Sequence, residues 1–185
     1  MPAKTYSFSS PRLRFTEATW GDLTQIHILQ STPEVDEFNT LGIPKSIEAT
    51  RKNMRAVIED KNKEKRSFFC WIIRQETDSA FVGICGLTLS AERFRLGEIY
   101  YNLLPAYWGK GYGTESAKAL IRFCFTRLKL HRVEAGVATA NERSIRLLEK
   151  VGMTREALHR KILPIRGEWK DNYEYAILED DRRDY

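Results

Sequence analysis

Apolar residues recur along this chain at two spacings, which predict two kinds of secondary structure. A spacing of two is typical of strands, and spacings of three and four are typical of helices. Segments rich in β-branched and aromatic side chains predict strands over residues 13–17, 68–74, 81–89, 96–104, 132–138, 157–163 and 169–178. Polar turns at residues 76–79 and 92–93 join the second, third and fourth of these strands, so the middle of the chain is expected to form an antiparallel meander.

Helical spacing predicts four helices. Thr19 and Ser46 are suitable N-caps for the first two, which are separated by a loop around Pro33 and Pro44. The third helix is clearly amphipathic, and the fourth covers residues 141–151 and ends at Gly152. The apolar positions of the first three helices are Leu23, Ile26 and Leu29; Ile47, Met54 and Val57; and Ala117, Leu120, Ile121, Cys124, Phe125 and Leu128.

In chain order the predicted elements read β-α-α-β-β-β-α-β-α-β-β. This order is typical of an α/β or α+β fold. The chain has 185 residues, without internal repeats or a break in composition. We therefore expect residues 1–185 to form a single domain whose core covers about residues 11–179.

Composition excludes several classes of protein. The hydrophobic share of 42% and the charged share of 30% are those of a globular chain. The longest apolar run, residues 68–73, is far shorter than the ~20 residues that cross a bilayer. Residues 1–7 contain no apolar h-region, so we expect no secretory signal. Cys70, Cys85 and Cys124 are far apart and have apolar neighbours, so we expect reduced core thiols, no metal site and a cytoplasmic protein.

The chain is basic, with a net charge of +5 and an isoelectric point near 9.1, which favours anionic partners. A basic surface in contact with water explains the same charge. The densest basic run, residues 61–66, contains Glu64 and no aromatic residue, unlike segments that bind single-stranded nucleic acids. A nucleic-acid partner is therefore not expected.

The strongest local feature is a glycine-rich junction between a strand and a helix. Pro105 ends the strand, and Gly109, Gly111 and Gly113 precede the amphipathic helix. Glycines allow tight turns and close approach of a ligand, and the first N–H groups of a helix have no internal partner. Such a junction suits an anion, above all a pyrophosphate, although a plain tight turn is the alternative. The spacing is not that of a P-loop, and the antiparallel meander before it argues against a dinucleotide-binding βαβ unit.

The junction resembles motif A of the GNAT superfamily of acetyltransferases, in which Arg or Gln is followed, after two residues, by Gly, any residue, and Gly or Ala. Gly111 and Gly113 match the two small positions, and Trp108 stands where the motif has Arg or Gln. Residues 141–144 (Asn-Glu-Arg-Ser) and 149–153 (Glu-Lys-Val-Gly-Met) are similar to a second signature of the RimJ/RimL-like branch. The resemblance extends over about residues 13–178 and includes the order of the elements.

The resemblance implies a GNAT fold, with a mixed, mostly antiparallel twisted sheet of about seven strands flanked by four helices. Acetyl-CoA, the acetyl donor, would lie in a cleft between the fourth and fifth strands. The pantetheine arm would pair with the backbone at Leu103 and Leu104, and Asn141 would bind the arm, cap its own helix, or do both. Lys110 either adds charge or points to solvent. The donor-binding residues implied are Leu103, Leu104, Trp108, Gly109, Lys110, Gly111, Tyr112, Gly113, Thr114, Asn141 and Ser144.

The implied reaction is direct acyl transfer to an amine, which needs a general base to remove a proton. Glu98 is the preferred base because it resembles the glutamate that serves as base in several histone-acetylating members of the family, and alternation places it with Tyr100 and Asn102 on a polar face of its strand. A carboxylate that orients the substrate or is only structural is the alternative role for Glu98, and Glu134 is the alternative base. Many family members have a Tyr near the leaving sulfur, but Leu148 occupies that position here. Ser144 is the alternative donor to the sulfur, or else it only completes the helix N-terminus.

The acceptor implied is a primary amine, with a protein N-terminal α-amine as the leading hypothesis and a small amine, such as a polyamine or an antibiotic, as the alternative. A non-catalytic acyl-CoA-binding module is a further alternative. Neither a membrane partner nor a choice between monomer and homodimer follows from the sequence. Asp171 or Glu37 is a candidate to hold a cationic acceptor. Aromatic and polar candidates for the acceptor pocket, or for core packing instead, are Phe38, Asn39, Trp169, Tyr173 and Tyr175.

Overall fold

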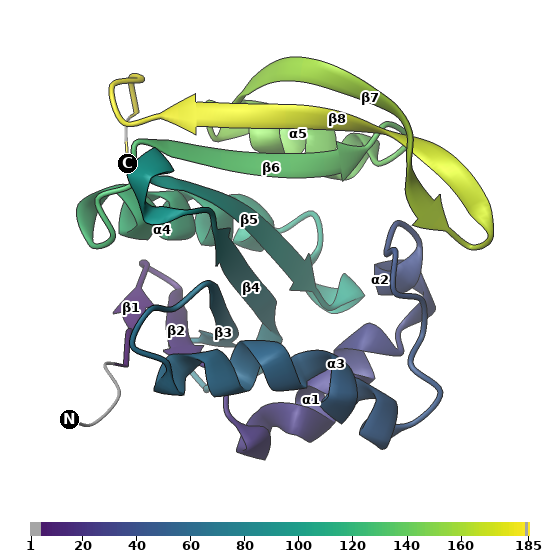
Figure 1. Cartoon of the computed structure of the whole chain (residues 1–185). Helices are drawn as coiled ribbons and strands as arrows, with labels where there is room; N and C mark the ends of the chain where they lie inside the picture. Colours follow the sequence, from purple (N-terminus) through teal and green to yellow (C-terminus); the bar gives the residue numbers. More distant parts are fainter. Residues whose placement is uncertain (1–4, 184) are drawn as a thin grey trace.

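A computed structural model, which describes residues 5–183 and 185, contains one twisted sheet of eight strands in the order β1-β2-β3-β4-β5-β6-β8-β7 (Figure 1). All neighbouring strands are antiparallel except β5 and β6, which are parallel. The strands are β1 (Phe8–Ser9), β2 (Leu13–Glu17), β3 (Phe68–Gln75), β4 (Phe81–Leu89), β5 (Leu96–Leu103), β6 (Arg132–Ala138), β7 (Thr154–Ile165) and β8 (Glu168–Leu178).

Helices cover both faces of the sheet and bury a separate apolar cluster on each. On one face α4 and α5 pack on side chains such as Trp71 and Ile99. On the other face α1 and α3 pack on side chains such as Ile72 and Ile84. The α-helices are α1 (Leu23–Gln30), α2 (Pro33–Asp36), α3 (Ile47–Glu59), α4 (Tyr112–Thr126) and α5 (Glu142–Lys150), with short 3-10 turns η1 (Trp20–Asp22), η2 (Asp60–Asn62), η3 (Glu92–Phe94) and η4 (Pro105–Tyr107).

The seven predicted strands and four predicted helices are confirmed, and the structure adds a short strand and a short α-helix besides the 3-10 turns. The two-residue strand β1 is too short to leave a periodic pattern, and aromatic contacts hold it: Phe8 stacks on Phe15 with ring centroids 4.5 Å apart and on Phe123 at 4.8 Å. Helix α2 lies within the predicted loop and begins with Pro33, a residue favoured at the first helical position. Because of β1, the strands counted as fourth and fifth from the sequence are β5 and β6.

The first predicted helix begins later than its proposed cap. Thr19 precedes the 3-10 turn η1, where its side chain and Asp22 form a capping box, and α1 starts only at Leu23. The cap proposed for the next helix is confirmed, because the Ser46 hydroxyl accepts a hydrogen bond from the Ala49 N–H (3.3 Å).

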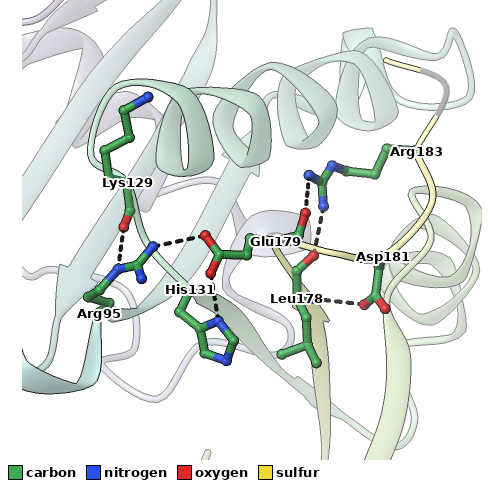
Figure 2. A network of polar contacts seen from close by, with 7 residues as sticks. All are labelled: Arg95, Lys129, His131, Leu178, Glu179, Asp181 and Arg183. Carbon is green, nitrogen blue, oxygen red and sulfur yellow. Dashed lines mark hydrogen bonds and ion pairs between the residues drawn. The ribbon is translucent and has the colours of Figure 1, made fainter.

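The parallel pairing of β5 with β6 covers only three residue pairs, Leu96–Arg132, Gly97–Val133 and Glu98–Glu134. A network of polar contacts closes this end of the pair (Figure 2). Glu179, after β8, pairs with Arg95 (2.8 Å) and with His131 (2.9 Å), and Arg95 also donates to the Lys129 carbonyl (2.8 Å). The starts of β5 and β6 are thus tied to the end of β8, and the two strands separate in the opposite direction.

The three cysteines are buried free thiols, which confirms their prediction as reduced core residues. Burial raises the pKa of the Cys70 thiol to about 12, so it stays protonated. Among the described residues, no helix combines the length and the apolar character needed to span a membrane.

Replacing Gly83 by Ala is expected to destabilise the fold, because an added Cβ would lie 2.1 Å from the Asn102 carbonyl oxygen and 2.7 Å from the Leu103 Cα. These atoms belong to the backbone of β5, which cannot move aside without disturbing β4. We expect Gly83→Ala to lower the free energy of unfolding by about 1–3 kcal/mol, measured by urea denaturation. Gly21→Ala is the control, since its Cβ would contact only the Thr19 hydroxyl, at 3.4 Å. Equal stability of the two variants would contradict this reading of the β4–β5 contact.

Candidate active site

A cavity of about 590 Å³ lies where β5 and β6 separate. Its walls come from β5, β6, the loop that precedes α4, and the first turns of α5. Residues of α2 and of the loop after it, including Val35 and Phe38, line its remaining side. Arg166, in the turn between β7 and β8, holds α2 in place, since it donates to the Pro33 carbonyl (3.4 Å) and pairs with the buried Asp36 (3.7 Å). The α2 side of the cavity is therefore held in place by contacts with the β7–β8 turn.

The backbone of β5 faces the cavity at every second residue. The Leu104 N–H donates to the Val82 carbonyl (2.9 Å), and in an antiparallel pair such bonds recur at alternate residues. Tyr101 and Leu103, which lie beyond the last β5–β6 pair, consequently direct their N–H and C=O groups away from β4, toward the space that β6 has left. One of these groups is already used, because the Trp108 indole donates to the Leu103 carbonyl (2.8 Å).

The loop before α4 is shaped for a close ligand. Gly109 and Gly111 have positive φ angles of 73° and 81°, and a Cβ at Gly109 would meet no atom within 4 Å. Gly111 is the N-cap residue of α4, so the free N–H groups of a 15-residue helix open onto the cavity. An anion such as a pyrophosphate fits this cradle, since it would occupy the space that side chains leave empty.

Arg12 supports the same loop from behind. Its guanidinium donates to the Lys110 carbonyl (3.1 Å) and pairs with Glu115 in the first turn of α4 (2.6 Å). Glu115 also accepts from the Ser10 hydroxyl (2.7 Å), and these partners lower the pKa of its carboxyl despite partial burial. The turn between β1 and β2 thus fixes the backbone of the glycine loop.

The N-terminus of α5 brings a hydroxyl pair into the cavity. The Asn141 side chain accepts from the Ser144 N–H (3.1 Å), so Asn141 is an N-cap. The Ser144 hydroxyl lies 2.6 Å from the Tyr101 hydroxyl on β5. Burial raises the pKa of Tyr101 to about 12, so the phenol stays protonated and can donate to Ser144, which leaves the proton of Ser144 free to point into the cavity.

Carboxylates gather on the opposite face of β5 and its neighbours. Glu98 and Glu134 face each other across the last β5–β6 pair, and Glu174 follows on β8. Arg132 pairs with Glu134 (2.6 Å) and also with Glu156. Among the described residues no cation pairs with Glu98, whose pKa is raised by burial and then by the nearby charge of Glu134. The pKa of Glu174 is raised as well, by burial and by the charges of Glu98 and Glu134.

Most of the residues predicted from the sequence meet in this cavity. The lining includes Glu98, Leu103, Trp108, Gly109, Gly111, Gly113, Thr114, Asn141 and Ser144. The competing base, Glu134, lies beside Glu98 but is held by Arg132.

The structure does not bring Leu104, Lys110 and Tyr112 into the lining. Leu104 packs against the cluster under α1 and α3, and its N–H and C=O bond to Val82 and Tyr107. The Lys110 ammonium donates to the Ala106 carbonyl (2.8 Å), on the loop itself. The Tyr112 hydroxyl donates to Gln75 (3.1 Å), and its ring lies under Arg12.

The aromatic candidates proposed for the acceptor pocket are divided by the structure. Phe38 and Asn39 line the cavity. On β8, however, Tyr175 is fully buried on the α4–α5 face and Trp169 is 62% exposed. Asp171 accepts from the Lys161 N–H (2.8 Å) and braces the hairpin. The β8 residues that share a face with Glu98 are Asn172 and Glu174, because the register places Glu174 opposite Gly136, two residues from Glu134.

Sequence reasoning missed several residues of the site, among them Tyr101, Arg12 and Arg143. Arg143 lines the cavity, with its guanidinium 3.8 Å from the centre of the Trp108 ring. Each of these residues acts through a partner on a distant part of the chain, so local patterns carry no signal for it. Only the positive charge of Arg143 beside the Asn141 motif was visible in the sequence.

Comparison with known protein families matches residues 12–154 to the acetyltransferase (GNAT) domain. The uncharacterised N-acetyltransferase p20 of Bacillus licheniformis is 32% identical over 84% of both chains. A Bacillus subtilis protein named as a candidate ribosomal N-acetyltransferase is 31% identical over 55% of both chains.

Solved structures share the fold. A GNAT-family acetyltransferase from Bacillus anthracis superposes with a TM-score of 0.81, at 28% identity, over 95% of this chain and 100% of its own. A spermidine N-acetyltransferase from Vibrio cholerae, solved with CoA and spermine, also has a TM-score of 0.81. It is 20% identical and covers 92% of this chain and 97% of its own, which is a likeness of fold.

The environment of Glu98 predicts an unusual titration. We expect its carboxyl, followed by ¹³C NMR, to titrate above the ordinary range of a glutamate, because burial and the Glu134 charge both disfavour its ionised form. Glu134→Gln removes one of these causes and should lower the pKa of Glu98. Glu59→Gln, which removes an exposed charge on α3, should leave it unchanged. An ordinary pKa for Glu98 in the unmodified protein would contradict this description of the site.

Proposed function

The chain belongs to the acetyltransferase (GNAT) domain family, and from this premise we propose that it acetylates the α-amino group at the N-terminus of a protein. It is an acetyl-CoA-dependent N-acetyltransferase, as family and relatives agree. The proposal concerns the acceptor and the residues that act on it. The relative named as a candidate ribosomal N-acetyltransferase supports a protein acceptor.

The observation that carries the proposal is the Glu98 carboxylate at the fork between β5 and β6. It lines the cavity, lacks a cationic partner among the described residues, and has a raised pKa. An amine acceptor arrives as an ammonium and must lose a proton before it attacks. A protein α-ammonium has a pKa of about 7.7–8.0, against about 10.4 for a lysine, so a carboxylate base removes its proton more easily. The acid–base properties of the site therefore favour the α-amine.

The donor would lie on the α4 and α5 side of the cleft. The free N–H groups at the start of α4 would hold its pyrophosphate, and the backbone of Tyr101 and Leu103 would pair with its pantetheine arm. Glu98 lies on the opposite face of β5 from the donor, so the acceptor would bind on the side of the cleft that carries the carboxylates.

The transfer then needs two proton movements. Glu98, directly or through a water molecule, takes the proton of the ammonium, and the amine nitrogen attacks the thioester carbonyl carbon. A C–N bond forms, the C–S bond breaks, and the sulfur leaves as a thiolate. Ser144 donates a hydrogen bond to this sulfur, and Tyr101, which keeps its own proton, donates to Ser144 from the buried side. The nitrogen loses its second proton to the thiolate, so the products are the amide, the CoA thiol and a protonated Glu98, which returns its proton to water.

A second candidate acceptor is a polyamine. The specific observation in its favour is the row of Glu98, Glu134 and Glu174 on adjacent strands, of which only Glu134 pairs with Arg132. A single ammonium needs one carboxylate, and a second cationic group of the acceptor would find another here. A basic peptide N-terminus satisfies the same charges, so the two candidates must be separated by experiment.

Acetyl-CoA is expected to stabilise the protein and to be consumed in the presence of a peptide. At 100 times the dissociation constant it should add about 2.7 kcal/mol, or roughly 5–11 °C in a thermal melt, with ATP as the anionic control. Thiol release should then be faster with a basic peptide that has a free N-terminus than with spermidine or with the same peptide formylated. A faster reaction with spermidine would instead support a polyamine as the acceptor. Stabilisation without thiol release from any amine would indicate a non-catalytic acyl-CoA-binding module.

Glu98→Gln is expected to lower kcat by about 10²–10⁴-fold while leaving acetyl-CoA binding unchanged, because it removes the base alone. In the unmodified enzyme kcat should fall as the pH drops through the raised pKa of Glu98, where the base becomes protonated. Glu134→Gln should shift this acid limb to lower pH. If Glu98→Gln keeps the kcat of the unmodified enzyme and the same fall in kcat at low pH, another group must be the general base.

A further inference from the structure

Arg143 occupies a defined place at the mouth of the cavity. It is the second residue of α5, is exposed to solvent, and has its guanidinium 3.8 Å from the centre of the Trp108 ring. The indole beneath it is fixed, because its N–H donates to the Leu103 carbonyl (2.8 Å). A guanidinium stacked on an anchored aromatic ring keeps its N–H groups available at the ring edge.

Arg143 also differs from its neighbour on the same helix. Arg146 pairs with Glu142 across one helical turn (3.0 Å). Arg143, in contrast, has no carboxylate partner among the described residues. Its charge is therefore uncompensated at the edge of a cavity that it lines together with Trp108.

The packing of α5 on α4 places this charge beside the glycine loop. Leu147, one turn after Arg143 on the same side of α5, lies so close to Gly113 that an added Cβ would come within 2.8 Å of its Cδ1. Gly113 is in the first turn of α4, where the free N–H groups are. Trp108, which carries Arg143, belongs to the loop that leads into that turn.

We propose that Arg143 is a phosphate-binding residue for the acetyl donor, held in position by the Trp108 ring. The proposal rests on the acetyl-CoA donor of the proposed function. It accounts for the departure at residue 108: the motif has Arg or Gln there, whereas this chain has an aromatic ring and receives a guanidinium from α5. A guanidinium binds phosphate through two parallel hydrogen bonds, which suits both the pyrophosphate and the 3′-phosphate of CoA.

Calorimetric titration of Arg143→Gln with CoA and with dephospho-CoA, which lacks the 3′-phosphate, tests the proposal. We expect the variant to bind CoA about tenfold to a hundredfold more weakly than the unmodified protein, the range for one lost charge-assisted contact. Equal losses for both ligands would assign Arg143 to the pyrophosphate, and a loss for CoA alone would assign it to the 3′-phosphate. Arg55→Gln, which removes an exposed, ion-paired arginine on α3, is the matched control and should bind both ligands normally.

Two further measurements separate phosphate binding from a structural role. Arg143→Lys should lose less affinity than Arg143→Gln, because it keeps the charge but not the planar pair of donors. The difference between Arg143→Gln and the unmodified protein should shrink as the salt concentration rises. Unchanged CoA affinity in Arg143→Gln would overturn the proposal, as would a loss that is independent of salt and accompanied by a lower melting temperature of the free protein. Failure of the unmodified protein to bind CoA would instead overturn the donor assignment, and this proposal with it.

Discussion

The site depends on one limit in the sheet, which is that β5 and β6 pair over only three residues before they separate. Backbone N–H and C=O groups without a strand partner must form other hydrogen bonds. Strand β4 pairs with the N–H and C=O groups of only every second residue of β5. The Trp108 indole takes the Leu103 carbonyl, and the remaining groups face a cavity. The contacts of Glu179 with Arg95 and His131 hold the paired end together, so the fork opens at Glu98 and Glu134.

Alternation along β5 then gives the cleft two chemically different sides. Tyr101 points toward α5 and meets Ser144, whereas Glu98 points to the face that carries Glu134 and Glu174. Positive groups gather on the first side, where the start of α4 and Arg143 lie, and the carboxyls with a raised pKa, Glu98 and Glu174, lie on the second. On the proposed placement, a polyanionic donor would be attracted to the first side and a cationic acceptor to the second, and each would be repelled by the other side. The two sides can therefore orient both substrates before any specific contact forms.

The sequence was sufficient for the parts of this fold that rest on periodicity. All seven longer strands and four longer helices follow from spacings of two and of three to four, and Ser46 caps its helix as predicted. The elements that it missed, β1 and α2, have two and four residues and are held by distant partners. Phe8 needs Phe15 and Phe123, and α2 is held by Arg166 from the β7–β8 turn. Contacts of this kind leave no local pattern in the chain.

The difference between local patterns and contacts from distant parts of the chain also decides how far the site could be predicted. Motif spacing was enough to bring Glu98, Gly111, Asn141 and Ser144 to one cavity, because those residues lie at the ends of predicted elements. The register of β8 decides which of its residues share a face with Glu98, and the candidates Trp169, Tyr173 and Tyr175 lie on the opposite face from Asn172 and Glu174, which were not predicted. Trp108 shows the limit most clearly. In sequence it looks like the loss of a polar motif residue, but in space its ring carries Arg143 from another helix. In its proposed role, Arg143 would supply from α5 the positive charge that residue 108 lacks.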